Sequence, residues 1–483
     1  MSQATSATPD PLVDLPVDVE VVNVGLPLFG EAVAEQGRPV VQVDWRVPAD
    51  GDLAVVRALT RTFGVHEATI EEANAEVFRR LDTGVAMLTG VATAADVVPG
   101  IEGHTLLHCG PAIEWAQVCD PLRRSMRAAV VAEGWAADVA AADGLLAAGD
   151  VRLEPANLHQ MVVPMATSIG PSSPVWVVEN REGATVAFAP INQGPGEVAW
   201  FGRDTDAAIQ RLRFLREVAG PLLGKVVAAA GPIDLFALAT QGIAMGDDVH
   251  MRTQATTNLL IRNLLPGLME HGAALGPAGV EFAKYLSGNH LFFLNLAMAA
   301  AKSLTLWAEQ VPHSSIVTTM ARNGTDFGIR LAGNDAWFLT QAPPVGEALY
   351  YSGQSAETAA KDIGDSAVLE LVGLGGPAAA GSPAVAAFLG GTMADARAAT
   401  ESMIEICRGP STRFKLPTMD FRGTPVGVDI RYVAETGITP KVNTGVLHVS
   451  DGSGQVGAGV ATAPLECFTA ALFDLDARLS ANA

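Results

Sequence analysis

Alternating apolar and polar positions in residues 1–130 predict an N-terminal α/β domain. Apolar runs at 17–25 and 38–45 flank an amphipathic stretch at 28–37 that ends in glycine. Strand, helix and strand at this spacing predict a Rossmann-like βαβ start, with its first strand buried and its two strands parallel. A longer helical pattern at 67–81 follows, with short strands expected further along this domain.

Residues 131–232 are predicted to form a second mixed α/β domain. Runs of strand length at 151–159, 174–180 and 185–192 are apolar or alternating, and Gly, Pro and Asn bound them. A helix is expected at 204–219, because its apolar residues recur at helical spacing.

Residues 233–312 are predicted to form an all-helical domain. The stretch 291–301 is apolar nearly all round, which is typical of the central helix of a small bundle. Asn289 could cap that helix at its start, and Pro312 lies just beyond its end. Pro266 is expected to kink or end the preceding helix.

Residues 313–483 alternate strands, Gly-rich loops and helices, which predicts a C-terminal mixed α/β domain. In this domain, 314–330 is predicted to be a strand that turns over and continues. Residues 420–431 resemble it, with Asp429 and Arg431 expected at alternate positions on one strand face. The fold class predicted for the whole chain is α/β (mixed α+β) and multidomain, with two or three mixed α/β domains plus a small all-helical domain.

Composition changes this picture mainly by excluding classes of partner. The 483 residues include 31 Lys and Arg against 52 Asp and Glu, which gives a net charge of −21. Since no Lys/Arg cluster interrupts this acidity, neither nucleic acid nor an anionic membrane is expected as a partner. Four cysteines form no CxxC pair, and no metal site is predicted.

Nothing in the sequence predicts targeting to a membrane. The N-terminus lacks the basic and apolar segments of a secretory signal. The longest uncharged run, 371–394, contains prolines, glycines and many alanines, so it is predicted to be buried helix and loop rather than a membrane span. The protein is therefore expected in the cytoplasm.

The densest group of chemistry-bearing side chains lies at 320–330, MARNGTDFGIR. Arg322 and Arg330 offer forked donors for a carboxylate or a phosphate. Asn323 can donate to a carbonyl oxygen, and Asp326 can take a proton. A tight turn with an Arg–Asp ion pair is the structural alternative for the same residues.

The GDDVHMR segment at 246–252 places His250 and Arg252 between two helices. Asp247, Asp248 and His250 could bind a metal, although no second histidine lies at helical spacing, or the segment could cap a helix, and His250 or Arg252 could face a substrate. Asn192 is a further candidate in the INQGPGE segment.

Two segments near the C-terminus add polar groups beside glycines. Asp365 and Ser366 follow a glycine, and Glu370 comes one helical turn later, which suits either capping or a carboxylate aimed into a cleft. No G-x-S-x-G motif surrounds Ser366, which argues against a serine hydrolase. The segment 452–459 matches G-x-G-x-x-G, but too few residues follow for a dinucleotide fold, so a Gly-rich loop beside Asn443, Thr444 and His448 is favoured.

A series of motifs carries a resemblance to a known family. In chain order they are NVGLPLFGEAVAEQG, VDWRVPA, INQGPGEVAWFG, AMGDDVHMR, GNHLFFLNLAMAAAK, MARNGTDFGIR, DIGDSAVLE, FRGTPVGVDIR, NTGVLH and GQVGAG. The chain resembles the YlbE-like (AllG-like) family, which is connected with oxamate carbamoyltransferase of anaerobic allantoin breakdown. The resemblance implies mixed α/β domains joined to a small all-helical domain.

The resemblance implies a carbamoyltransferase subunit that acts on a small anionic ureido substrate. The implied reaction converts oxalurate and phosphate to carbamoyl phosphate and oxamate, or the reverse, with phosphate as co-substrate and no cofactor. The implied partners are an FdrA-type subunit, itself similar to acyl-CoA synthetases, and a third small subunit; a homodimer is a further possibility. The catalytic candidates are Arg322, Asn323, Asp326 and His250, and the substrate-binding candidates are Arg330, Arg252, Asn192, Asp365, Ser366, Asn443, Thr444 and His448.

Two other functions stay open: a non-catalytic scaffold subunit that completes the site of an FdrA-type partner, and an amide or ureido hydrolase or ligase. The chain departs from the family pattern at Val47, Gln193, Glu197 and Val249, where Pro, Glu, Lys and Cys are usual. Glu197 in place of a lysine reverses a charge, and a different ligand is expected if that lysine contacts phosphate or oxalurate in the family. Arg322→Ala is expected to abolish carbamoyl phosphate formation and to leave thermal stability nearly unchanged.

Overall fold

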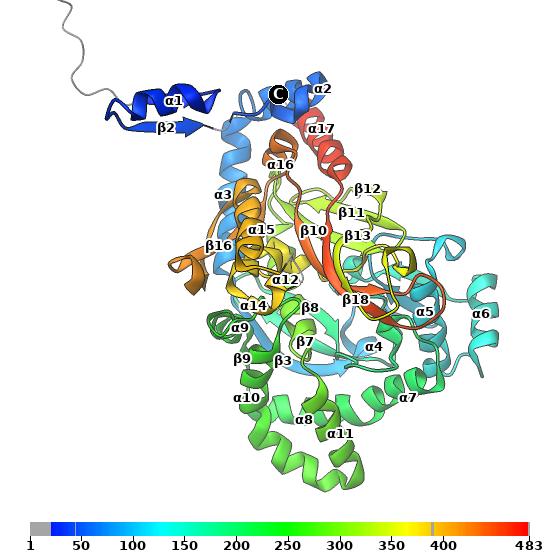
Figure 1. Ribbon diagram of the computed structural model, residues 1–483. Helices are drawn as coiled ribbons and strands as arrows, with labels where there is room; N and C mark the ends of the chain where they lie inside the picture. Colours follow the sequence, from blue (N-terminus) through cyan, green and yellow to red (C-terminus); the bar gives the residue numbers. More distant parts are fainter. Residues whose placement is uncertain (1–20, 44, 388–390, 482–483) are drawn as a thin grey trace, which may run out of the picture. The chain divides into compact units, whose positions relative to one another are not determined.

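The chain forms two compact units, Met1–Gly51 and Asp52–Ala483 (Figure 1). This computed structural model describes residues 21–43, 45–387 and 391–481. Each unit is described separately below.

The N-terminal unit is a βαβ motif. Strand β1 (Val21–Val24) and strand β2 (Val40–Val43) are parallel, and helix α1 (Pro27–Ala34) connects them. This arrangement confirms the predicted βαβ start. The expected burial of the first strand is wrong over its described part, because the side chains of β1 are alternately half-buried and exposed. Two strands and one helix offer too little surface to cover both faces of a strand.

Helix α12 (Leu294–Ala308) forms the centre of the second unit, as its apolar sequence predicts. Most of its residues are buried, and it packs against strands and helices from several parts of the chain (Figure 1). The helix begins at Leu294, so the expectation that Asn289 caps it is wrong. Asn289 instead follows the end of α11 (Pro277–Gly288), and turns connect it to α12.

The segment 233–310 is largely helical, as predicted. Besides α11 and α12 it contains α9 (Leu235–Ala244) and α10 (Gln254–Gly272). Pro266 lies inside α10 and does not end it. In Figure 1, α10 and α11 form the lower end of this unit.

One antiparallel sheet combines strands from the first three predicted domains. Its order is β8 (Thr185–Pro190), β7 (Pro174–Asn180), β3 (Ala86–Thr93) and β9 (Ile233–Asp234). Hydrogen-bonded strand pairs therefore cross the predicted boundaries near 130 and 232, while the division into four domains stays a prediction.

A second small sheet lies beside two helices of the same part of the chain. Strand β4 (Thr105–His108) pairs in parallel with β5 (Arg152–Pro155) and antiparallel with β6 (Ser168–Ile169). The neighbouring helices are α5 (Asp120–Glu133) and α6 (Val139–Ala148).

The strand that turns over is confirmed as an antiparallel hairpin of β10 (Val317–Asn323) and β11 (Asp326–Leu331). Strands β12 (Phe338–Gln341) and β14 (Ile363–Gly364) extend it on either side. Because β14 pairs with Arg322 and Asn323, the DIGDSAVLE segment lies directly beside the MARNGTDFGIR segment.

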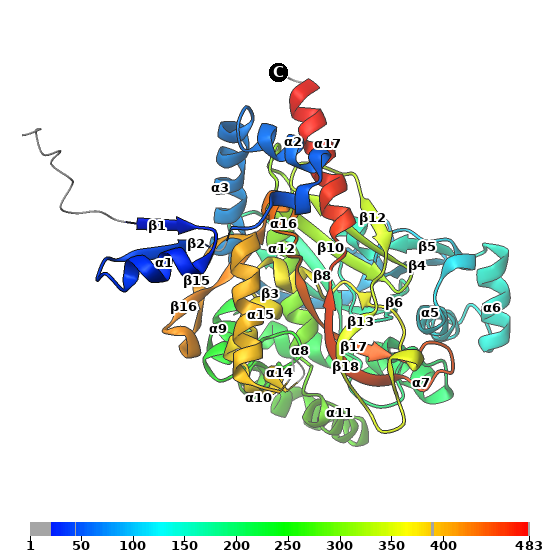
Figure 2. The ribbon, with the colours of Figure 1, turned by 45° about the horizontal axis from the view of Figure 1, so that its top comes forward.

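The remaining strands form a three-stranded sheet and a ribbon. Strand β18 (Gln455–Thr462) lies between β13 (Val345–Tyr350) and β17 (Lys441–Leu447) (Figure 2). Strand β15 (Cys407–Leu416) pairs with β16 (Arg422–Val428).

The predicted second strand after β16 is wrong. The chain instead forms helix α16 (Ile430–Thr436), and Asp429 caps it by accepting the Arg431 N–H at 2.9 Å. Asp429 and Arg431 also form a buried ion pair at 2.7 Å. The side-chain cap of Asp429, the residue directly before the helix, explains the change, because it satisfies the N–H of Arg431 at the start of the helix.

The other helices surround this framework. They are α2 (Leu53–Thr62), α3 (Glu67–Thr83), α4 (Ala94–Val97), α7 (Asp206–Phe214), α8 (Gly220–Ala230), α13 (Val368–Leu371), α14 (Pro383–Ala386), α15 (Met393–Ile406) and α17 (Leu465–Ala481). A π-helical turn, Leu215–Ala219, joins α7 to α8. No helix in the described ranges is long and apolar enough to cross a membrane.

Candidate functional site

Several of the predicted motifs meet at one small cavity in the second unit. Its volume is about 40 Å³, which exceeds what a single water needs. Two of the predicted site residues, His250 and Ser366, line it, and a third lining residue, Gly445, directly follows the candidates Asn443 and Thr444. The other lining residues are Pro164, Met165, Trp200, Phe201, Met251, Leu291, Leu294 and Gln455, so most of the wall is apolar.

His250 is the titratable side chain that lines this cavity. It lies in the loop between α9 and α10, and its Nδ1 is 2.7 Å from Oε1 of Glu370 on α13. Both side chains are buried. Because Nδ1 is engaged by the carboxylate, Nε2 is the ring nitrogen left for a ligand. The pair thus has the geometry of a histidine oriented for proton transfer.

Asp248 fixes the loop that carries His250. Its carboxylate accepts the backbone N–H groups of His250 at 3.2 Å, Met251 at 3.2 Å and Arg252 at 2.7 Å. It also accepts a 2.6 Å hydrogen bond from Nδ2 of Asn443. Burial raises the pKa of Asp248, an effect that these donors oppose.

Two non-glycine residues with positive φ lie at or next to the same cavity. Val249 has a φ of 62° and Met165 a φ of 49°. A β-branched residue with positive φ is rare, because its side chain crowds the backbone. Strained residues persist where surrounding contacts fix them, and they are concentrated at functional sites. At Val249, the contacts include its N–H bond to Arg252 O at 3.0 Å.

Glu370 occupies a pocket of backbone donors. Its Oε1 accepts the N–H groups of Gly376 and Asn443, both at 3.3 Å. Gly375, with a φ of 66°, lets the chain pass so close that a Cβ there would collide with Oε1. Glu370 Oε2 and Asn443 Oδ1 are buried without a hydrogen-bond donor from the described residues. A ligand with N–H groups could satisfy such acceptors.

Arg322 lies behind the cavity and is fully buried. Its Nε and Nη2 donate to the two oxygens of Asp362 at 2.7 and 2.9 Å, and Nη1 donates to Gly364 O at 2.6 Å. Thr444 donates to the same Asp362 carboxylate at 3.0 Å. The fork expected to bind an anion is therefore occupied. This buried pair argues against the expectation that Arg322→Ala preserves stability, because Asp362 would lose its charged partner.

Asp365 connects three segments beneath the cavity. Its two oxygens accept the N–H of Gly110 at 2.8 Å and the N–H of Val163 at 3.1 Å. Burial raises the pKa of Asp365 to about 7. Asp365 thus orients the neighbouring Ser366, which lines the cavity.

The other candidates of the MARNGTDFGIR segment lie outside the cavity wall. Asn323 forms the turn of the hairpin, where its Oδ1 accepts the N–H groups of Thr325 at 3.0 Å and Asp326 at 2.6 Å. Arg330 pairs with Asp335 at 2.6 Å. Asp326 is half-buried on β11. The structural alternative of a tight turn fits Asn323. Its ion pair fits Arg330, although the partner, Asp335, lies beyond the hairpin turn.

Two further candidates take part in local structure. His448 accepts the Ser450 N–H at 3.2 Å and lies 2.8 Å from Asp451. Arg252 lies 3.3 Å from Asp247, which also accepts N–H groups at the start of α10. Neither of the two is among the residues that line the cavity.

Asn192 shapes the loop that carries Trp200. Its Nδ2 donates to Asn295 on α12 at 2.9 Å, and its Oδ1 accepts the Gly194 N–H at 2.9 Å. Gln193, one of the departures from the family pattern, accepts the Trp200 N–H at 3.0 Å. Glu197, another of these departures, forms an ion pair with Arg203 at 3.1 Å and is not among the residues that line the cavity.

Sequence reasoning missed several residues of this cluster. The sequence suggests Asp248 only as a metal ligand or a cap, suggests Glu370 as a cap or a carboxylate aimed into a cleft, and gives no role to Asp362 or Trp200. The paired acidic residues before His250 and the spacing of Glu370 from Ser366 were the available signals. Within the described ranges, no group of three His, Cys, Asp or Glu residues could hold a metal ion.

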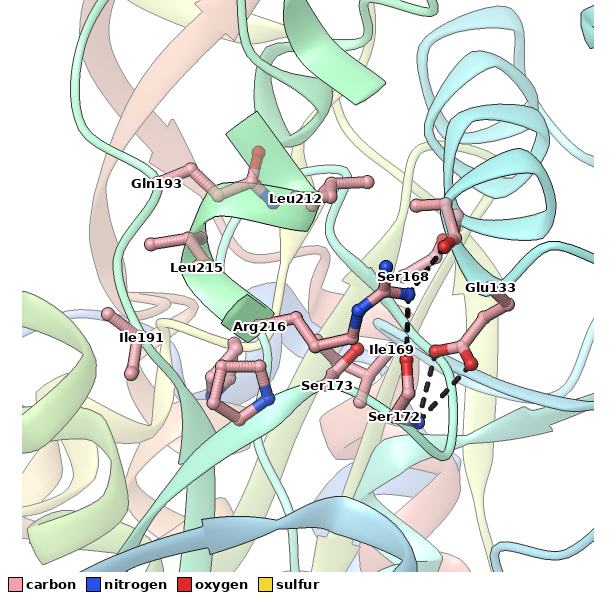
Figure 3. Close-up of a pocket in the computed structure, with 14 residues that line it drawn as sticks. Glu133, Ser168, Ile169, Ser172, Ser173, Ile191, Gln193, Leu212, Leu215 and Arg216 are labelled. Carbon is pink, nitrogen blue, oxygen red and sulfur yellow. Dashed lines mark hydrogen bonds between the residues drawn. The ribbon is translucent and has the colours of Figure 1, made fainter. Parts of the chain in front are cut away.

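A second cavity, of about 30 Å³, lies between α5 and the α7–α8 junction (Figure 3). Glu133 accepts the Ser172 N–H at 3.1 Å, and Arg216 donates to Ala132 O at 2.7 Å. Burial raises the pKa of Glu133. Arg216 and Glu133 both have local partners, so this cavity offers less chemistry than the first.

The largest cavity, of about 830 Å³, is a groove between α10 and α11. Apolar side chains such as Leu265, Met269 and Val280 dominate its wall, and none of its lining residues is titratable. It could accommodate an apolar surface but has no group for acid–base chemistry.

Comparison with known proteins places the chain among related sequences. A family profile described as "Oxamate carbamoyltransferase subunit AllG" matches residues 151–366. The Escherichia coli K12 protein named oxamate carbamoyltransferase subunit AllG is 38% identical over 84% of this chain and 97% of its own length. The uncharacterized protein YahG of the same organism is 34% identical over 94% of this chain and 96% of its own. A crystal structure of a conserved protein of unknown function from Enterococcus faecalis V583 superimposes with a TM-score of 0.82 at 34% identity, covering 85% of this chain and 98% of the other.

Proposed function

This chain belongs to the AllG family, and we propose that it is a carbamoyltransferase subunit whose cavity beside His250 receives the carbamoyl group of a small ureido acid. The proposed substrate is oxalurate, which reacts with phosphate to give carbamoyl phosphate and oxamate, or the reverse. The proposed partners are an FdrA-type subunit and a third small subunit. No cofactor beyond the phosphate co-substrate is required by this chemistry.

The single observation that carries the proposal is the convergence of separate motifs on an oriented histidine. His250, Ser366 and Gly445 line one cavity, and the 2.7 Å contact with Glu370 holds the His250 ring. An oriented imidazole in a closed, mostly apolar space is suited to general acid–base chemistry.

The proposed steps follow from the reaction's charges. A phosphate oxygen forms a bond to the carbamoyl carbon, and a tetrahedral centre with an oxyanion results. The bond from that carbon to the oxamate nitrogen then breaks, and the nitrogen takes a proton from Nε2 of His250. The Ser366 hydroxyl is the proposed donor to the oxyanion, a contribution of about 3–4 kcal/mol for one well-placed donor.

The test is phosphate-dependent formation of carbamoyl phosphate from oxalurate by the complex of this chain with its two partner subunits. His250→Gln should lower kcat by roughly 10²- to 10⁴-fold with little change in thermal stability. His448→Gln is the matched control and should retain activity, because His448 lies outside the cavity. Unchanged turnover in His250→Gln, or no turnover of oxalurate by the wild-type complex, would contradict the proposal.

A second candidate function is hydrolysis of an amide or ureido compound. The absence of Arg or Lys from the residues that line the cavity favours it, because water needs no cation where phosphate does. Release of oxamate from oxalurate at the same rate with and without phosphate would support hydrolysis over transfer.

A further inference from the structure

We infer that the cavity beside His250 is a neutral half-site, which holds a carbamoyl group, while a basic partner subunit supplies the cations for the substrate's anionic ends. This inference rests on the proposed function and concerns the division of the site between chains. A complete site for oxalurate and phosphate must hold a carboxylate and a phosphate as well as the reacting group.

None of the described residues that line the cavity is a lysine or an arginine, and Arg252, in the same loop as His250, is half-buried and lies 3.3 Å from Asp247. Arg322, directly behind, gives all its forked donors to Asp362 and Gly364. Arg203, from the loop that carries Trp200, donates to Ser453 O at 3.2 Å and pairs with Glu197 at 3.1 Å.

The charges that are present would repel an anion. Glu370 is bound to His250, and Asp248 holds the loop of the same histidine. Both carboxylates are buried, where charges are weakly screened. A phosphate bound by this chain alone would face these groups without a compensating cation, and the net charge of −21 adds to the repulsion.

The dimensions and the hydrogen-bonding groups suit a small neutral group. A volume of about 40 Å³ is far below the several hundred Å³ of sites that enclose whole ligands. The unpartnered acceptors in the adjacent cluster, Glu370 Oε2 and Asn443 Oδ1, favour N–H donors such as those of a carbamoyl group.

Three of the lining residues, Met251, Leu291 and Gln455, are half-buried and uncharged, and we place the opening of the cavity among them. The rest of a ureido acid would extend through this opening. We therefore assign the surface around it to a partner protein that presents Arg or Lys, which an acidic chain would attract electrostatically.

The test compares neutral and anionic probes on the full-length chain alone and on the complex with its partner subunits. Urea is the neutral probe, inorganic phosphate and oxamate are the anionic probes, and the NMR signals of the His250 ring report binding. Urea should shift these signals in the isolated chain, whereas phosphate should not. In the complex, phosphate should bind at least 10-fold more tightly than to the chain alone, and added salt should weaken that binding.

Two glycine variants show whether urea occupies this cavity. Gly445→Ala places a methyl group in the cavity against the end of the Met165 side chain, and it should weaken the urea response at least 10-fold. Gly346→Ala is the matched control, because a Cβ at that position meets nothing within 4 Å, and it should respond like the wild type.

The outcomes separate this inference from the proposed function. Phosphate binding to the isolated chain as tight as to the complex would overturn the half-site, and so would a His250 ring that ignores urea. Phosphate binding that requires self-association of this chain would replace the basic partner by a second copy. A complex that shows the expected probe pattern yet forms no carbamoyl phosphate would overturn the proposed function alone.

Discussion

The hairpin at β10–β11 and the loop at 246–252 use charged residues in opposite ways. In the hairpin, the Arg322 guanidinium donates its hydrogen bonds to Asp362 and Gly364, and the Asn323 side-chain oxygen accepts an N–H of its own turn. In the loop, the Asp248 carboxylate accepts backbone N–H groups and thereby fixes the loop conformation. His250 lines the cavity with one ring nitrogen left for a ligand. The region with more charged groups is thus the more structural one, and the region with strained backbone is the better candidate for chemistry.

This difference predicts that the largest loss of stability comes from the hairpin. Arg322→Ala leaves the buried Asp362 carboxylate without its cation, so the free energy of unfolding should fall by about 3–5 kcal/mol. Arg330→Ala, in the same hairpin, also removes a buried side chain but should cost less stability, because its partner Asp335 is fully exposed and stays hydrated. Chemical denaturation of both variants measures the contrast, and equal losses would show that the hairpin's ion pairs are equivalent.

In the loop region the expected effect falls on turnover rather than on folding. Glu370→Gln keeps an oxygen beside His250 Nδ1 but replaces the charged acceptor that orients the ring, so kcat should fall by roughly 10²-fold. Glu370 is a positioning residue, and therefore the pH profile of kcat should also shift. A variant that loses activity only in proportion to its loss of folded protein would assign Glu370 a structural role.

The pH dependence of stability tests the role of Asp365, which is buried next to the lining residue Ser366. Its folded-state pKa, about 7, lies above its usual 3.8, so the folded state holds this proton more tightly. The resulting stabilisation is complete below about pH 3.8 and is lost as pH rises through 7, by at most about 1.4 kcal/mol per pH unit. Between pH 5 and 7, Asp365→Asn should lose this downward slope. Asp335→Asn, on an exposed side chain, should keep it, and identical slopes in both variants would contradict the assignment.

The smallest expected effect is a difference in stability that measures the backbone strain at Val249. Val249→Gly removes a buried side chain but also relieves a φ of 62°. Val442→Gly removes an equally buried side chain from β17, where no such strain exists. Val249→Gly should therefore lose less stability, by about 1–2 kcal/mol. Equal losses in denaturant unfolding would mean that the loop stores no strain.

The sequence predicted those features that depend on local spacing. The apolar run at 291–301 identified the central helix, and the alternation in 314–330 identified the hairpin. It could not predict that Arg322 meets Asp362 across β14, because a charged pair forty residues apart leaves no pattern. For the same reason the contact of His250 with Glu370, which links a loop to a helix 120 residues later, became visible only in the fold.

Corrections at Asn289 and Asp429 have a common cause. Both residues were assigned from the residue type at one position, and in each case another element supplied a better partner. Asn289 donates to Asn192 at 3.1 Å instead of capping α12, and Asp429 caps a helix where a strand was expected. Short polar side chains fit several local structures, so tertiary contacts decide among them.

The tight passage at Gly375 means that the chemistry of this protein can be damaged at a position with no functional group. A methyl group added there would push against Glu370 and, through it, turn the His250 ring. A survey of inactivating mutations would therefore mark residue 375 as essential, although it would contribute only empty space.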